Sequence, residues 1–241
     1  YHTYILDSSP DGSWVYYGNF FMDGSSTSHV KNIKTSESYS FSESNWGKFS
    51  SNSKWFTMTM NSNRLVLNNL KMGTMDTIDN VKVHHFSHSG NYLITQSTND
   101  SLTINALDKK KVHKAGTNKE FALNPQMDTM MMAIKSNDGE TLQLLYFETF
   151  STYVIMECKN VSFPRMEWSA NGEKLGFIYS NDNGKTFNIG MFNLKTKTTQ
   201  VLDWDSLSYK ALAISDTQIS VSNSGEKVYF HVLPQQLAPE D

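Results

Sequence analysis

The sequence contains a single cysteine, Cys158, so no disulfide can form within the chain. Long apolar runs are also missing, and none reaches the roughly 18 residues that suggest a membrane-spanning helix. Lys and Arg total 21 against 24 Asp and Glu, which gives a formal net charge of −3. The one basic run, Lys109–Lys111, is typical of a solvated hairpin tip rather than of a phosphate-binding patch. The composition therefore argues against a disulfide scaffold, a membrane span and a nucleic-acid partner.

The usual signatures of catalysis and metal binding are missing too. No Gly-x-Ser-x-Gly segment occurs, so the nucleophile elbow of serine hydrolases is absent from the sequence. Cys158 is a lone thiol. We favour a structural role for it, as a small residue near a strand end, over a role as a reactive nucleophile. His84, His85 and His88 are close in sequence, but adjacent strand residues point to opposite faces and no carboxylate or cysteine has ligand spacing. We therefore expect no catalytic, cofactor-binding or metal-binding residue in this chain.

Two further groups of residues have a functional and a structural interpretation. Asp203-Trp204-Asp205 offers paired carboxylates, but acid–base work requires a cleft that separates their pKa values, and a solvated turn is favoured. Aromatic side chains are the second group, as candidates for a binding platform, although packing between sheets is their more frequent use. They are Tyr16, Tyr17, Phe20, Phe21 and Trp46.

The sequence does contain a turn-and-strand motif, here called the repeated phrase, in six copies. Its first copy, Ser9–Tyr17, has a Pro-Asp-Gly turn followed by an aromatic and β-branched run that suits a strand. The spacing is roughly 40 residues and lengthens toward 50, which is the range of propeller blades. The later copies are Ser50–Met58, Ser87–Thr95, Asn124–Met132, Ser169–Phe177 and Ser222–Phe230.

The segments between these copies also predict strands. Second runs with period-2 alternation follow several copies, and short polar turns lead into a further strand such as Thr198–Leu202. The second runs are Val30–Thr35, Leu65–Leu70, Leu102–Asp108 and Asn188–Lys197. No segment has sustained helical periodicity, and the repeat register assigns Met127–Met132 to a strand. We therefore expect an all-β fold, a β-propeller of about five to six four-stranded antiparallel blades, with the repeated phrase as punctuation between blades.

One segment, Ser180–Phe187, resembles the Asp box, Ser-x-Asp-x-Gly-x-Thr-Trp, of sialidase-like propellers. In those proteins the box stabilises a hairpin and is not catalytic. A carbohydrate-active propeller of that type would need further boxes and several arginines, whereas this chain has one box and two arginines, Arg64 and Arg165. We therefore interpret the segment as a turn inside the fifth repeat.

The phrase Ser9–Tyr17 resembles the propeller repeats shared by TolB-like proteins and the prolyl oligopeptidase family. Segment order is most similar to the N-terminal propeller of bacterial prolyl-oligopeptidase-like peptidases, and the similarity extends over essentially the whole chain. The segments that carry it are Val30–Thr35, Tyr39–Phe41, Lys48–Phe56 and Val221–Phe230. The resemblance implies that residues 1–241 are a single β-propeller domain or propeller segment, which limits the access of peptides to an α/β-hydrolase. None of the matched positions is a catalytic position of that family.

The same resemblance implies partners outside this chain. They are a peptide substrate or a C-terminal α/β-hydrolase domain, so that this chain alone is not an enzyme while its parent is a serine peptidase. Propellers of the family usually have seven or eight blades, so this chain is expected to be incomplete: either the propeller continues after Asp241 or the chain is an ordered or proteolysed fragment of it. The alternative is a free-standing TolB-like propeller that binds another protein. Abundant Ser, Asn and Thr suit a periplasmic or extracellular protein, while Tyr1 in place of an initiator Met leaves a missing signal peptide uninformative.

Overall fold

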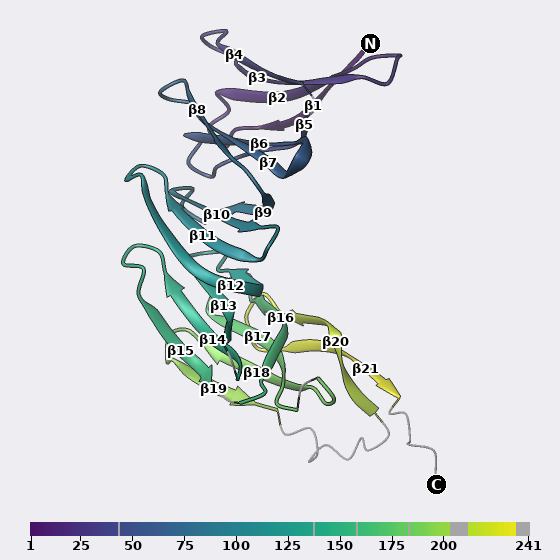
Figure 1. The fold of residues 1–241 in the computed structure, drawn as a ribbon, viewed down its shortest axis with the longest axis vertical. Coiled ribbons are helices and arrows are strands. Elements are labelled where there is room, and N and C mark those ends of the chain that lie inside the picture. Colours follow the sequence, from purple (N-terminus) through teal and green to yellow (C-terminus); the bar gives the residue numbers. More distant parts are fainter. Residues whose placement is uncertain (43, 137, 158, 183, 203–211, 235–241) are drawn as a thin grey trace. The chain divides into compact units, whose positions relative to one another are not determined.

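The computed structural model describes residues 1–42, 44–136, 138–157, 159–182, 184–202 and 212–234 (Figure 1). These residues form β-strands and turns, with a single 3₁₀ turn at Asn61–Asn63. Among them there is no helix long and apolar enough to cross a membrane. The chain divides into two compact units, Tyr1–Lys114 and Ala115–Asp241, and the division falls inside the long strand β12 (Lys111–Leu123).

The first unit contains three antiparallel sheets, which we name blades 1 to 3. Blade 1 has the strand order β1-β2-β3-β4, and blade 2 has the order β5-β6-β7-β8. Blade 3 consists of β9, β10, β11 and the beginning of β12. The bounds are β1 (His2–Ser8), β2 (Trp14–Phe20), β3 (Ser26–Asn32), β4 (Ser38–Ser42), β5 (Ser44–Phe49), β6 (Trp55–Met60), β7 (Arg64–Asn69), β8 (Thr74–Ile78), β9 (Val81–Phe86), β10 (Tyr92–Ser97) and β11 (Ser101–Ala106).

The second unit contains blades 4 to 6. Blade 4 consists of the remainder of β12 with β13, β14 and β15, and blade 5 has the order β16-β17-β18-β19. The described part of blade 6 is the pair β20-β21. The bounds are β13 (Thr129–Ser136), β14 (Gly139–Tyr146), β15 (Thr152–Glu157), β16 (Ser162–Trp168), β17 (Lys174–Ser180), β18 (Asn188–Asn193), β19 (Thr198–Val201), β20 (Leu212–Val221) and β21 (Val228–Pro234). The predicted all-β propeller architecture of four-stranded antiparallel blades is confirmed, with six repeats present.

Consecutive blades within a unit pack face to face. Between blades 1 and 2 the core consists of Trp14, Tyr16, Val30 and Phe41 on one side and Phe49, Phe56, Met58 and Leu70 on the other. Blade 2 buries its opposite face as well, with Trp55, Leu65 and Leu67 against Val81, Leu93 and Leu107 of blade 3. Since successive residues of a strand point to opposite faces, a run such as Trp55–Met58 is apolar on both sides. A blade of this composition depends on its neighbours for stability.

The second unit follows the same rule. Blades 4 and 5 share a core of Met131, Ala133, Leu142 and Leu144 with Phe163, Met166, Leu175, Phe177 and Phe192. Blade 5 packs its other face, through Ile178 and Ile189, against Ile214 and Ile219 of blade 6. Both faces of the second strand of blade 5 are therefore buried, as in blade 2.

The repeated phrase forms the turn between the first and second strands of each blade. In blade 1 the backbone N–H of Ser9 donates to Trp14 O (3.0 Å), and the N–H of Trp14 donates to Ser9 Oγ (2.9 Å). Ser9 Oγ donates in turn to Asp11 Oδ1 (2.7 Å), and the N–H of Gly12 donates to Ser9 O (2.8 Å). The serine hydroxyl thus closes the turn from inside.

The expectation that the phrase separates one blade from the next is therefore wrong. The strand before each turn pairs with the strand after it, as β1 does with β2 and β5 with β6. Some of these first strands, such as Ser44–Phe49, are short and largely polar, so their sequences give little strand signal. The blade boundary lies one strand earlier than the repeat pattern suggests.

Equivalent turns of consecutive blades are hydrogen-bonded to one another within each unit. In the first unit the N–H of Asp11 donates to Ser53 Oγ (3.0 Å), and Asn52 Nδ2 donates to Asn91 Oδ1 (2.9 Å). The second unit has bonds from Asn124 Nδ2 to Gly172 O (2.8 Å) and from Gln126 Nε2 to Ala170 O (2.9 Å). Polar contacts between turns thus accompany the apolar contacts between blade faces.

The turn glycines allow a matched test of this close approach. Gly12 and Gly90 both have positive φ, +67° and +73°, but a Cβ on Gly12 meets nothing within 4 Å, whereas a Cβ on Gly90 lies 2.9 Å from Asn52 N. We expect Gly12→Ala to cost about 1 kcal/mol of unfolding free energy, since an L-residue is strained there. Gly90→Ala adds a clash with the backbone of blade 2, for a total of about 2–4 kcal/mol. Urea unfolding followed by tryptophan fluorescence measures both, and equal losses would contradict a tight contact between the turns.

Candidate functional site

The two histidines of β9, His84 and His85, are partly buried, and His84 lies between blades 2 and 3. His84 Nε2 is 3.1 Å from Thr57 Oγ1 of β6. Burial lowers the pKa of His84 to about 4, with smaller contributions from the charges of His85 and Lys48. The pKa of His85 is lowered as well, by burial and then by Lys48. Both imidazoles are therefore neutral at physiological pH, and the Thr57 contact makes His84 part of the interface between the two blades.

The histidine cluster does not assemble a metal site. His88 is exposed in the turn after β9, apart from the two partly buried side chains. Across the residues that the structure describes, no group of three or more His, Cys, Asp and Glu side chains is arranged to hold a metal ion. Two other sequence candidates, Cys158 and Asp203-Trp204-Asp205, lie outside the described residues.

The segment that resembles an Asp box is the connection between β17 and β18. Asp182 accepts hydrogen bonds from the N–H of Thr186 (2.9 Å), from Thr186 Oγ1 (2.7 Å) and from Ser180 Oγ (2.7 Å). These bonds, above all that from the backbone of Thr186, hold the pKa of Asp182 well below its usual range. Phe187 packs against the core between blades 5 and 6. All these polar groups are engaged in closing the turn of the fifth repeat.

The five aromatic candidates have different fates. Tyr16 is 2% exposed in the core between blades 1 and 2, and the half-buried Tyr17 stacks on His29 with 5.0 Å between ring centroids. Phe20, Phe21 and Trp46 are exposed, so packing between sheets is the wrong expectation for these three. Phe20 follows the strand alternation of Tyr16, but it lies at the end of β2, and its ring contacts Tyr4 rather than blade 2.

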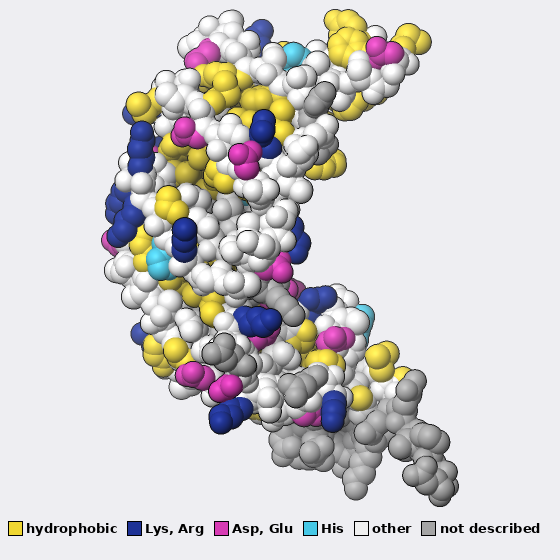
Figure 2. Space-filling view, viewed as in Figure 1, with side chains coloured by type: hydrophobic (Ala, Val, Ile, Leu, Met, Phe, Trp, Pro, Cys, Tyr) yellow, Lys and Arg dark blue, Asp and Glu magenta, His cyan; other side chains and the backbone are white. Residues whose placement is uncertain are grey.

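Exposed apolar side chains gather at the end of blade 1 that holds the N-terminus, where Figure 2 shows hydrophobic groups close together. We name this group the tip surface; its members are Tyr1, Tyr4, Leu6, Phe20, Phe21 and Met22. Tyr4 and Phe20 meet edge to face, with 5.7 Å between centroids, and Tyr1 lies 5.8 Å from Phe21. The sequence contains these aromatics, but their exposure depends on where blade 2 ends.

An ion pair between the first strands of blades 4 and 5 has no counterpart in the sequence patterns. Arg165 Nη1 lies 3.8 Å from Glu120 Oε2, and Arg165 Nε donates to Thr217 O of β20 (3.3 Å). Burial raises the pKa of Glu120, the charge of Arg165 opposes this, and Glu140 adds to it. The two residues are 45 positions apart in the sequence, so a local sequence pattern cannot predict that they pair. Its contacts describe a link between strands rather than a reactive group.

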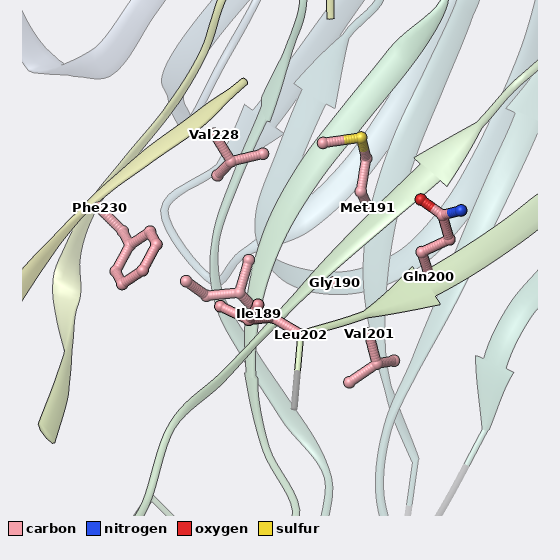
Figure 3. A pocket seen from close by; sticks show the side chains of 8 residues that line it. All are labelled: Ile189, Gly190, Met191, Gln200, Val201, Leu202, Val228 and Phe230. Atoms are coloured by element: carbon pink, nitrogen blue, oxygen red, sulfur yellow. The ribbon is translucent and has the colours of Figure 1, made fainter. Parts of the chain in front are cut away.

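The second unit has an apolar pocket of about 320 Å³ beside β18, β19 and β21 (Figure 3). Its lining is Ile189, Gly190, Met191, Gln200, Val201, Leu202, Val228 and Phe230. Gln200 is the one described lining residue with a polar side chain, and the described lining contains no nucleophile, acid or base. The described lining is suited to an apolar group.

Comparison with known proteins gives structural neighbours only. No protein-family model matches the sequence, and no curated protein does. Among solved structures, an oligogalacturonate lyase from Vibrio parahaemolyticus is 12% identical with a TM-score of 0.49, over 94% of this chain and 76% of that one. A second oligogalacturonate lyase, solved in complex with manganese, is 12% identical with a TM-score of 0.46, over 81% and 63%. The acylaminoacyl peptidase of Pyrococcus horikoshii is 12% identical with a TM-score of 0.48, over 96% and 43%.

The chain thus spans less than two thirds of the second and third of these structures. At such identities a structural likeness says nothing about activity. The architecture therefore rests on the strand pairing and blade packing described above.

The lowered pKa of His84 predicts a pH-dependent stability. As pH falls below about 6.5 the unfolded chain binds a proton that the folded protein resists until about pH 4. The stability that the protein has with neutral His84 is fully present above pH 6.5. The free energy of unfolding then decreases between pH 6.5 and 4 and changes no further through His84 below pH 4. We expect His84→Gln, which keeps a partner for Thr57, to flatten this decrease by on the order of 2 kcal/mol. Urea unfolding at several pH values measures it, with His88→Gln as the exposed control; an unchanged profile in His84→Gln would sink the prediction.

Proposed function

We propose that this chain is a non-catalytic β-propeller segment of a prolyl-oligopeptidase-like serine peptidase, in which it serves as scaffold and limits access to the hydrolase. The observation that carries the proposal is the repeated turn that begins at Ser9. It supports the family assignment through its sequence, and it builds a regular, hydrogen-bonded series of blades in the structure. A domain that excludes large substrates must resist deformation, and hydrogen bonds between consecutive blades contribute to that resistance.

The distribution of polar groups supports a scaffold role. Buried serines and their Asp or Asn partners are used within turns, as at Ser9, Ser50 and Ser169. His84 and the Arg165–Glu120 pair connect strands of neighbouring blades. In this proposal the peptide-cleaving groups belong to a separate hydrolase domain, and a periplasmic or extracellular location is suggested by composition alone.

A second candidate, a TolB-like propeller that binds another protein, is favoured by the tip surface. Met22 is 97% exposed and Tyr1 76%, and contiguous exposed apolar side chains of this kind mark interaction sites in soluble proteins. A scaffold that serves only as a filter has no need of them. This candidate retains the propeller and assigns its purpose to the surface of blade 1.

The test compares this chain with the full product of its reading frame. We expect the longer product to react with a fluorophosphonate probe and to cleave peptide p-nitroanilides of two to four residues faster than a 30-residue peptide. The 241-residue chain alone is expected to do neither. Turnover by residues 1–241 that a point substitution within them abolishes would disprove the non-catalytic role. A full product without a Gly-x-Ser-x-Gly segment and without labelling would favour the TolB-like candidate.

A further inference from the structure

The tip surface is held together by its own rings rather than by the core. Tyr4 lies against Phe20 and Tyr1 against Phe21, while Leu6 lies near Gly18 on the same face of the sheet. None of the six residues belongs to the apolar cluster between blades 1 and 2. Aromatic side chains that contact one another and water carry much of the binding energy of protein interfaces once they are covered.

The strand beside this surface, β1, has an accessible edge. All seven residues of β1 are exposed, whereas β9 and β16, the first strands of blades 3 and 5, are partly or fully buried over most of their length. Among the described strands β1 pairs with β2 and no other. An edge of this kind offers unpaired N–H and C=O groups to an extended segment. Tyr4 and Ile5 point to opposite faces, so a strand added here meets apolar side chains on both.

The formally charged side chains nearest in sequence to the tip surface are acidic. Asp7 follows Leu6 and Asp23 follows Met22, and the sequence has no Lys or Arg before Lys31. Asp23 accepts hydrogen bonds from the N–H of Ser25 (2.9 Å) and from Ser25 Oγ (2.6 Å), and these bonds lower its pKa. It therefore stays ionised in mildly acidic conditions. A negative rim attracts basic residues and repels an anionic lipid surface.

We propose that the outer edge of β1 and the tip surface bind an extended segment of a partner protein, with apolar side chains at alternating positions and Lys or Arg beside them. The segment adds to blade 1 as a fifth strand, and its backbone pairs with β1. One set of its side chains packs on Tyr4 and Phe20, and its basic residues lie near Asp7 and Asp23. This inference deepens the second candidate function above, and it does not require that the chain caps a hydrolase.

The probe is a synthetic peptide, acetyl-Lys-Val-Thr-Phe-Thr-Val-Lys-amide, added to the 241-residue chain. We expect saturable binding, with slower hydrogen exchange of the amides of β1 and of no strand in blades 4 to 6. Tyr4→Ser with Phe20→Ser is expected to weaken binding at least tenfold. Met75→Ser, which changes an exposed apolar residue of β8, is the matched control and is expected to leave binding unchanged. Circular dichroism of each variant verifies the fold.

Two variant peptides separate the backbone and charge contributions. N-methylation of the central Phe removes an N–H while keeping the side chain and is expected to weaken binding at least tenfold. Glu in place of both Lys is expected to weaken it at least fivefold at low salt. Unchanged exchange of β1, or equal binding by the Tyr4/Phe20 variant, would overturn the proposal. Binding to phosphatidylserine vesicles and not to the peptide would mean that the surface binds a membrane. Dimerisation that the Tyr4/Phe20 variant abolishes would mean that it binds a second copy of the chain. If the full reading-frame product does not bind the peptide, the tip surface is covered within that product. This result would refute binding of a separate partner protein, whether or not the product has peptidase activity.

Discussion

The rest of this fold depends on the hydrogen bonds made by the buried serine hydroxyl of the repeated turn. Ser9, Ser50 and Ser169 are at most 2% exposed, and each hydroxyl donates to an Asp or Asn side chain two residues later while accepting from the backbone five residues later. Loss of such a hydroxyl leaves a buried N–H unpaired, which costs about 1–3 kcal/mol. The turn fixes the register of the first two strands, and register decides which side chains enter each core. At Asn124 an amide oxygen accepts from Gln126 N and Met127 N instead, so the degraded copy still closes.

This constraint connects the turn chemistry to the proposed role. Once register is fixed, alternating side chains place Phe56 and Met58 on one face of blade 2 and Trp55 on the other, so the blade needs a neighbour on each side. Hydrogen bonds between turns, such as Asn52 with Asn91, add a polar link at the same interfaces. Many polar interactions of the described chain thus stabilise turns and contacts between blades, while the tip surface and the edge of β1 are exposed.

Much of the architecture can be predicted from sequence because its main signals are local. Asp-Gly and Asn-Gly turns, period-2 runs and a repeat near 40 residues are together sufficient to predict five to six blades. Some first strands are harder to recognise, since Ser44–Phe49, for example, is polar and short, and this shifts the predicted blade boundary by one strand. The exposure of Phe20 and the Arg165–Glu120 pair depend on where distant strands end and meet, and neither leaves a trace in neighbouring residues.

The core shared by blades 1 and 2 has a consequence for synthesis on the ribosome. The face formed by Trp14, Tyr16, Val30 and Phe41 is buried by Phe49, Phe56, Met58 and Leu70 of blade 2, which are synthesised after it. At translation rates of about 5–20 residues per second, the completed face waits on the order of 0.4–6 s for these residues. During this interval a nascent chain presents a broad aromatic surface together with an open strand edge, which is the form that chaperones bind and that neighbouring nascent chains can pair with.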